Sequence, residues 1–206
     1  MARSKTSQKW LDRHVKDEFV KRSVKDGYRS RAVYKLIELN DKSRFFKKGQ
    51  TVVDLGAAPG GWLQVAAQEV GEKGNVIGLD LLPIDPLEDV ETIEGDFQED
   101  AILAELENKL AGNKVDLVLS DMAPNMSGMV AVDQPRAMYL CELALAFAIE
   151  HLQPNGWFVA KVFQGEGFEP FLKEVRSHFS KVVMRKPKAS RPKSREMYLV
   201  AGGFKL

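Results

Sequence analysis

Two residues, one within an apolar segment and one directly after another, have side chains that could move a proton. Lys161 lies within Trp-Phe-Val-Ala-Lys-Val-Phe (residues 157–163), a run that is otherwise apolar on both alternating faces. A charged side chain inside a buried strand is costly unless it is paired or functional. Asp121 follows the apolar run 115–120. The strands expected at 115–120 and 157–163 would be neighbours in the usual doubly wound order. We therefore expect Lys161 and Asp121 to meet; the simpler alternative is that Lys161 only extends its amine into water.

A glycine-rich turn supplies a second kind of chemistry, the binding of a nucleoside. The turn Asp-Leu-Gly-Ala-Ala-Pro-Gly-Gly (residues 54–61) lies between a strand and a helix, where open α/β sheets bind ligands. Asp80 ends the next strand, the usual place for an acid that holds ribose hydroxyls. Asp96 ends a third strand and could accept from an adenine amino group, with Trp62 or Phe97 as apolar cover. The alternative, a plain tight turn, does not explain acids after three successive strands.

The same turn argues against a phosphate-containing cofactor. Ala58 stands at the middle glycine of the dinucleotide fingerprint, and Pro59 removes an amide donor. No Gly-Lys-Ser/Thr sequence for a phosphate-binding loop is present. S-adenosyl-L-methionine, which has a nucleoside and no phosphate, fits these residues better than a dinucleotide.

Short β-branched runs that alternate with helical periodicity must position these residues. The pattern predicts an α/β, Rossmann-like fold with a mostly parallel seven-stranded sheet and helices on both faces. The expected strands cover residues 51–55, 76–79, 91–93, 115–120, 157–163, 181–185 and 196–202. Helices are expected from 62 to a stop at Gly71, over 102–110, from an N-cap at Asp133 with Pro135 in the first turn, and over 168–179.

The first 50 residues follow a different pattern. Helical spacing predicts two helices, near 8–26 and 30–40, with Gly27 as the break between them. We expect one domain over residues 1–206, made of a basic helical extension (1–50) and a Rossmann-like core (51–206).

Charge is strongly segregated although the net charge is only +1. Residues 1–50 have a balance of +9, residues 51–172 of −16, and residues 173–206 of +8. Basic ends around an acidic middle favour a polyanionic partner; solvated basic tails are the alternative. A single cysteine and three scattered histidines predict no metal site. With no run near the about 20 apolar residues that cross a bilayer and no apolar leader, we expect a cytoplasmic protein without a membrane partner.

Four stretches together resemble one known family. They are residues 54–61, Ser-Asp-Met-Ala-Pro-Asn (120–125), Pro-Arg-Ala-Met-Tyr-Leu (135–140) and Lys-Val-Phe-Gln-Gly (161–165), and the likeness extends from about Trp10 to the C-terminus. It includes Arg-Ser-Arg-Ala (29–32) and Ser-Arg-Pro-Lys-Ser-Arg-Glu (190–196). The sequence is similar to the FtsJ/RrmJ family of ribosomal RNA ribose 2′-O-methyltransferases, most of all to bacterial members that act on 23S ribosomal RNA.

The resemblance implies particular site residues. The family's catalytic Lys-Asp-Lys-Glu set falls on Lys35, Asp121, Lys161 and Glu196. Its cofactor contacts fall on Gly60, Trp62, Asp80, Asp96 and Asp121. Lys35 and Glu196 are selected by the resemblance alone, because residue chemistry does not single them out.

The implied reaction is in-line displacement of a sulfonium methyl group by a ribose 2′-oxygen. The enzyme must align the reacting atoms, which supplies up to roughly 7–11 kcal/mol, and manage one proton. Lys161 would receive or steer that proton, and the sequence leaves open whether it acts as a neutral base or as a charged guide. Asp121 would hold the methionine amino group and position Lys161.

Substrate RNA is expected to contact basic residues on both ends of the chain. Residues 185–195 hold six positive charges and no acid. With them we expect phosphate contacts from Lys9, Arg13, Lys16, Lys21, Arg22, Arg29 and Arg31. The implied partner is ribosomal RNA in the large (50S) ribosomal subunit, bound by a monomer. Open alternatives are a transfer RNA or messenger RNA cap 2′-O-methyltransferase, a non-catalytic RNA-binding assembly factor, and a nicotinamide dehydrogenase.

Overall fold

Seven segments of the chain form one sheet in the computed structural model, which describes residues 17–191 and 194–206. The strands are β1 (Thr51–Leu55), β2 (Asn75–Asp80), β3 (Val90–Glu94), β4 (Val115–Ser120), β5 (Leu152–Phe163), β6 (Phe179–Arg185) and β7 (Glu196–Phe204). Their order is β3-β2-β1-β4-β5-β7-β6. The first five in this order run parallel, and β7 is antiparallel to both of its neighbours. The predicted mostly parallel seven-stranded sheet is confirmed.

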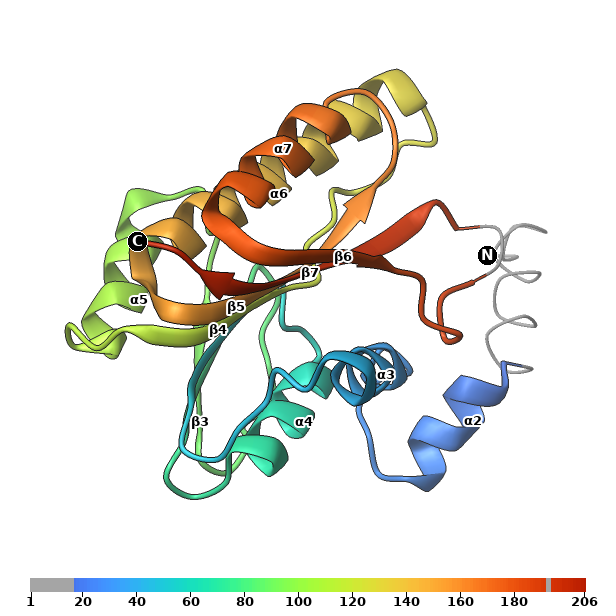
Figure 1. The fold of residues 1–206 in the computed structure, drawn as a ribbon. Helices are drawn as coiled ribbons and strands as arrows, with labels where there is room; N and C mark the ends of the chain where they lie inside the picture. Colours follow the sequence, from blue (N-terminus) through green and yellow to red (C-terminus); the bar gives the residue numbers. More distant parts are fainter. Residues whose placement is uncertain (1–16, 192–193) are drawn as a thin grey trace.

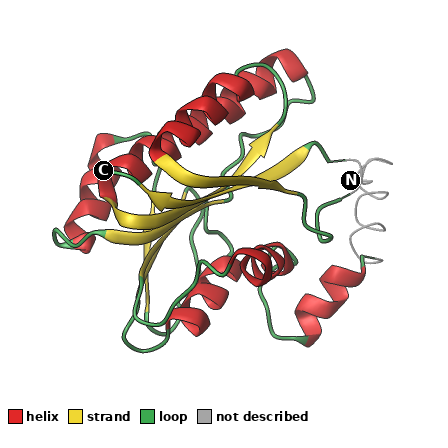
Figure 2. Ribbon diagram, viewed as in Figure 1, coloured by secondary structure: helices red, strands yellow, loops and turns green. Residues whose placement is uncertain are grey.

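Helices cover both faces of the sheet (Figures 1 and 2). One face carries α5 (Asp100–Leu110), α6 (Val130–His151) and α7 (Phe168–His178), which share an apolar core with the strands. The other carries α3 (Val33–Ser43) and α4 (Gly61–Val70), which form a second core. A shorter helix, α2 (Glu18–Lys25), precedes α3. Because the central strands β1, β2 and β4 are buried on both faces, they read as nearly continuous apolar runs rather than alternating ones.

Two glycines end helical segments as the sequence predicts. Gly27 follows α2 with φ +76° and separates it from α3. Gly71 is the C-cap of α4 with φ +69°, and its amide donates to Ala67. Positive φ is a conformation that glycine adopts without steric cost.

The predicted start of α6 is wrong. The helix begins at Val130 with Met129 as N-cap, so Pro135 lies inside the helix rather than in its first turn. Asp133 does not cap this helix, because its carboxylate accepts hydrogen bonds from the preceding loop: the amide and hydroxyl of Ser127 at 2.8 Å and the amide of Gly128 at 2.9 Å. Asp133 therefore fixes the loop that leads into α6.

Smaller differences concern the ends of other elements. Phe179, expected on a helix, begins β6, since α7 ends one residue earlier. Strand β5 begins five residues before the expected start, at Leu152. Part of the first expected helix, the basic residues Lys9, Arg13 and Lys16, and Lys193 lie outside the described residues. Within residues 17–191 and 194–206, no helix is both long and apolar enough to cross a bilayer.

Candidate active site

The glycine turn after β1 is held close to two other loops. The amides of Gly56 and Ala57 donate to Leu79 at the end of β2, and the amide of Ala58 donates to Asp80 Oδ2 at 2.9 Å. Gly56 has φ +80°, and a Cβ there would lie 2.8 Å from the amide nitrogen of Met122. Glycine at this position therefore lets the turn and the loop after β4 approach each other.

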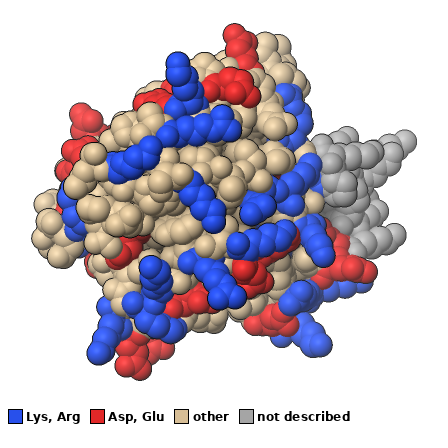
Figure 3. Space-filling model, in the orientation of Figure 1, with Lys and Arg blue, Asp and Glu red and all other residues tan. Residues whose placement is uncertain are grey.

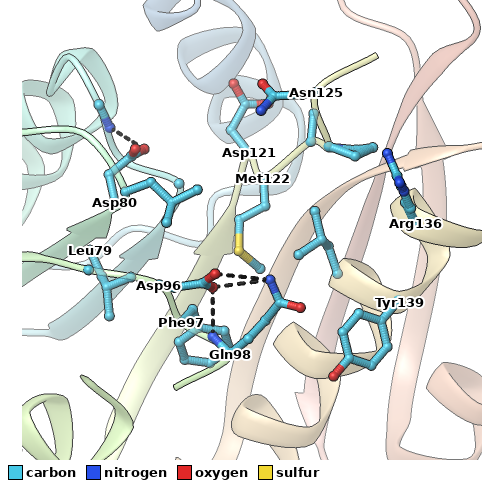
Figure 4. Close-up of a pocket in the computed structure, with 17 residues that line it drawn as sticks. Leu79, Asp80, Asp96, Phe97, Gln98, Asp121, Met122, Asn125, Arg136 and Tyr139 are labelled. Carbon is cyan, nitrogen blue, oxygen red and sulfur yellow. Dashed lines mark hydrogen bonds between the residues drawn. The ribbon is translucent and has the colours of Figure 1, made fainter. Parts of the chain in front are cut away.

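A cavity of about 520 Å³ opens at the carboxyl ends of β1, β2 and β4, within the range of small-molecule sites (Figure 4). Its wall includes Leu79, Phe97 and Met122 as apolar surface. Three carboxylates, from Asp80, Asp96 and Asp121, face a single cationic side chain, Arg136, among the residues that line it. Such a wall suits a ligand with positive charge and repels a pyrophosphate.

Asp80 and Asp96 are oriented by local hydrogen bonds. Asp80 Oδ1 accepts from the amide of Leu82 at 2.9 Å, in addition to the contact from Ala58. Asp96 accepts from the amide and side chain of Gln98 at 2.9 and 3.1 Å. A carboxylate has about four acceptor positions, so each acid retains capacity for a ligand hydroxyl or amine.

Asp54 lies fully buried at the end of β1, and both of its oxygens lack a hydrogen-bond partner. Burial, reinforced by the charges of Asp121 and Asp80, raises the pKa of its carboxyl well above the ordinary range. The folded protein therefore opposes ionisation of this carboxyl, and the negative charge near the cavity comes from the other acids.

Lys161 and Asp121 meet as predicted. Lys161 Nζ donates to the backbone oxygen of Asp121 at 2.6 Å and lies 3.2 Å from its Oδ1. The pairing follows from the sheet, because β4 and β5 are parallel neighbours. The hydrogen bond to the backbone oxygen takes one N–H group of the amine, and the Asp121 carboxylate lies beside it as an ion-pair partner. These contacts orient the amine, which keeps capacity for a further hydrogen bond.

Lys35 and Glu196 form a second ion pair beside the first. Lys35 Nζ, on α3, lies 2.8 Å from Glu196 Oε1 at the start of β7. Both side chains are more than four-fifths buried. The structure thus brings together the four residues that the family resemblance selects.

Tyr198 joins the two pairs and was not predicted. Its hydroxyl donates to Asp121 Oδ1 at 2.7 Å and accepts from Lys35 Nζ at 3.1 Å. The side chain is fully buried, and burial together with the nearby Asp121 and Glu196 charges raises the pKa of the phenol well above 10. Tyr198 is the cross-strand partner of Lys161 in the β5–β7 register. In the sequence, Tyr198 stands in an apolar run, where a tyrosine usually indicates a residue of the hydrophobic core.

Gly60 and Trp62, expected to contact the cofactor, do not line the described cavity. Trp62 is buried, donates from Nε1 to the backbone oxygen of Ala32 at 2.9 Å, and has its ring 5.8 Å from that of Tyr198. Gly60 is the N-cap of α4 with φ +100°, and a Cβ there would lie 2.7 Å from Arg29 Nη1. The structure thus gives both residues packing roles around the turn; their cofactor contacts stay a prediction.

Arg29 has an inward role that its basic surroundings do not suggest. Its guanidinium donates to the backbone oxygens of Pro59 at 3.1 Å, Asp85 at 2.7 Å and Pro86 at 2.9 Å. These contacts tie the segment before α3 to the glycine turn and to the loop after β2. Arg29 therefore links two loops whose neighbouring residues, Ala58 and Leu81, line the cavity.

Comparison with known proteins agrees with this geometry. The family model for FtsJ-like methyltransferases matches residues 28–204. A protein named ribosomal RNA large subunit methyltransferase E from Cellvibrio japonicus is 58% identical over 204 residues, with 99% of this chain and 97% of the relative covered. The protein of the same name from Pseudomonas aeruginosa PAO1 is 57% identical over 205 residues, with 100% and 99% covered.

A solved structure extends the likeness to three dimensions. A protein described as a ribosomal RNA methyltransferase from Plasmodium falciparum has a TM-score of 0.77 and 32% identity, with 86% of this chain and 98% of that chain covered. Sheet order, the acidic cavity and the four-residue cluster all lie within the matched span. The chain belongs to the FtsJ-like methyltransferase family.

Proposed function

We propose that this chain transfers the methyl group of S-adenosyl-L-methionine to the ribose 2′-hydroxyl of a uridine in 23S ribosomal RNA, in the context of the large ribosomal subunit. One observation carries the proposal. Asp121, which pairs with Lys161, lines an acidic cavity, and the paired Lys35 and Glu196 line a basic pocket.

The acidic cavity fits this cofactor. Asp80, Asp96, Phe97 and Asp121 line the cavity. In the proposal Asp80 would accept from ribose hydroxyls, Asp96 from the adenine amino group under Phe97, and Asp121 would hold the methionine ammonium group. When bound, S-adenosylmethionine supplies an electrophilic methyl group on a positively charged sulfur. A pyrophosphate in the same place would face three carboxylates, which disfavours a nicotinamide dinucleotide.

Lys161 manages the acceptor hydroxyl in this proposal. Asp121 orients the amine, and the capacity of Nζ that Asp121 does not use would meet the 2′-hydroxyl. With its amine neutral, Lys161 would take the hydroxyl proton on Nζ while the ribose oxygen replaces sulfur on the methyl carbon, and the electron pair of the broken carbon–sulfur bond would leave with S-adenosylhomocysteine. The Tyr198 hydroxyl, which accepts from Lys35, holds the Asp121 carboxylate in place, so that Lys161 keeps one orientation.

A basic pocket on the other side of the four residues suits the RNA backbone. It has a volume of about 450 Å³ and is lined by Arg31, Ala32, Lys35, Ala189, Arg191, Ser194 and Glu196. Lys and Arg side chains also gather on the face around β6, β7 and the segment that joins them (Figure 3). Phosphate contacts from such residues would supply most of the affinity for RNA.

Ribosomal RNA is the proposed substrate because relatives 57–58% identical along almost the whole chain carry the name of large-subunit ribosomal RNA methyltransferases. We further propose that the protein acts as a monomer in the cytoplasm.

The decisive experiment incubates the protein with labelled S-adenosylmethionine and, in separate reactions, with large ribosomal subunits, naked 23S RNA or transfer RNA. We expect one methyl group on a ribose 2′-oxygen of 23S RNA. Label on transfer RNA alone, or no transfer at all, would overturn the proposal.

A further inference from the structure

A second cavity, which we call the Phe163 pocket, lies beyond the carboxyl end of β5. Its volume is about 250 Å³. Its apolar wall is formed by Met126, Val130, Ala137 and Phe163, and Ser194 and Arg195 lie at its edge. Met126 and Val130 are each more than half exposed, on the loop and first turn that precede the body of α6. The pocket belongs to neither the cofactor cavity nor the four-residue cluster.

Polar side chains hold the walls of this pocket rather than face a ligand. Asp133 accepts three hydrogen bonds from Ser127 and Gly128. Gln134 Nε2 donates to the backbone oxygens of Phe163 and Glu166, both at 3.0 Å, and ties α6 to the end of β5. The apolar surface is therefore preformed, and the amide hydrogens of Gln134 are already used.

The register of the sheet places this pocket next to the reacting atoms. Phe163 follows Lys161 by two residues on β5, a rise of about 7 Å in a strand. Its cross-strand partner is Glu196, just as the partner of Lys161 is Tyr198. A nucleotide whose 2′-hydroxyl meets Lys161 carries its base on the adjacent ribose carbon, within reach of Phe163.

The basic pocket and the Phe163 pocket differ in the chemistry of the side chains that line them. The basic pocket contains Arg31, Lys35 and Arg191 and suits a phosphate. The Phe163 pocket offers an aromatic ring, a thioether and aliphatic carbons, and suits the face of a base. Ser194 lines both, so the two surfaces are continuous. A volume of about 250 Å³ is below the range for whole small molecules and fits a single ring system.

We propose that the Phe163 pocket receives the unstacked base of the acceptor nucleotide, while the basic pocket holds its phosphate. The inference rests on the proposed function and deepens it by naming where the nucleotide is gripped. Apolar and stacking contacts with the base then fix the ribose, and with it the 2′-oxygen, in front of Lys161.

The test combines protein variants with a substrate that lacks the base. The acceptor nucleotide, once mapped, is replaced by an abasic ribose that keeps its 2′-hydroxyl, in whichever RNA form, fragment or reconstituted subunit, the protein methylates. Loss of a stacked base should lower kcat/KM of the unaltered protein by about 5- to 150-fold. The double variant Met126→Ala/Val130→Ala should lower kcat/KM on intact RNA but cause no further loss on abasic RNA.

Met129→Ala is the matched control, since this methionine is 64% exposed on the same loop but does not line the pocket. It should behave as the unaltered protein on both RNAs, and all variants should bind S-adenosylhomocysteine with unchanged affinity. Equal losses on intact and abasic RNA, or full activity of the unaltered protein on abasic RNA, would overturn the inference. If the unaltered protein methylates intact RNA neither as a fragment nor in a reconstituted subunit, the proposed function is overturned instead.

Discussion

At the scale of single residues, Tyr198 connects the two ion pairs of the site. Its hydroxyl oxygen contacts both Asp121 and Lys35, so it sets their separation. Since Asp121 in turn contacts Lys161, a shift of the Asp121 carboxylate also displaces the amine of Lys161. Tyr198 is a positioning residue in this account.

We expect Tyr198→Phe to lower kcat by about 10- to 100-fold, because two hydrogen bonds to charged groups are lost while packing is kept. The dissociation constant for S-adenosylhomocysteine should change less than twofold. Tyr28→Phe is the matched control, since its hydroxyl makes only a long 3.5 Å contact with Gln68 at the surface. An unchanged kcat would show that the bridge has no role.

Asp54 gives a prediction about stability and pH. The raised pKa means that the folded protein resists ionisation of this carboxyl, whereas the unfolded chain ionises near the ordinary value of about 3.9. Stability is therefore lost as pH rises from that value toward the folded-state pKa. Asp54→Asn, which cannot ionise, should gain in free energy of unfolding relative to the unaltered protein as pH rises. Urea unfolding without cofactor at several pH values measures this gap, and a gap that is constant or shrinks would contradict the assignment.

Residue chemistry alone predicts half of the catalytic cluster. Lys161 stands out because an amine inside an apolar strand demands a partner, and Asp121 because it ends the neighbouring strand. Lys35 is one of many basic residues before position 50, and its role depends on a contact with β7 more than 150 residues away. Only the family resemblance, or the structure, can select it. Neither residue chemistry nor the resemblance selects Tyr198, because a tyrosine in an apolar strand is typical of the hydrophobic core.

At the scale of elements, the segment before α3 acts as a brace for the cofactor cavity. Arg29 donates to three carbonyl groups, one in the glycine turn and two in the loop after β2. Arg31 likewise contacts Asp17 and the backbone oxygen of Ala189, which links the same segment to the chain before β7.

Removal of the brace should weaken cofactor binding. We expect Arg29→Ala to raise the dissociation constant for S-adenosylhomocysteine by about 10-fold, the effect of one or two lost hydrogen bonds. Arg22→Ala, which removes an exposed arginine on α2 that pairs with Asp26, is the control and should leave the constant unchanged. Titration calorimetry measures both. If the two variants bind equally well, Arg29 does not support the cavity.

Element boundaries show where sequence patterns fail. The central strands are predictable because β1, β2 and β4 are mainly apolar runs bounded by turn residues. The start of α6 is not, since an aspartate followed by a proline has the pattern of a helix start, whereas Asp133 satisfies loop amides within the helix. Arg29 shows the same limit, because a basic residue in a basic segment is expected to lie at the surface rather than to bind loop carbonyl groups.

At the scale of the whole molecule, charge segregation separates two tasks. The acidic middle of the chain supplies the carboxylates of the cofactor cavity, and the basic residues Arg31, Lys35 and Arg191 from the two ends line a separate pocket. The protein can thus attract RNA while it keeps a negative surface around a cationic cofactor.

This arrangement predicts strong salt dependence of RNA binding. The logarithm of the association constant should fall linearly with the logarithm of salt concentration, by about 0.7–0.9 per phosphate contact. Arg191→Gln should reduce that slope by about one contact, because Arg191 lines the basic pocket. Filter binding over a range of potassium chloride concentrations measures the slope. A flat dependence would indicate that the acceptor is not a polyanion.

The central claim is that Lys161 manages the proton of a ribose 2′-hydroxyl. The direct measurement compares methyl transfer to the RNA of large ribosomal subunits by the unaltered protein, Lys161→Met and Lys161→Arg, alongside their affinity for S-adenosylhomocysteine. Both variants should bind the cofactor normally and lose at least about 10²- to 10⁴-fold in kcat. Arginine should not rescue, because its planar guanidinium cannot accept a proton or reproduce the tetrahedral contacts to Asp121. Retained turnover in Lys161→Met would contradict the account.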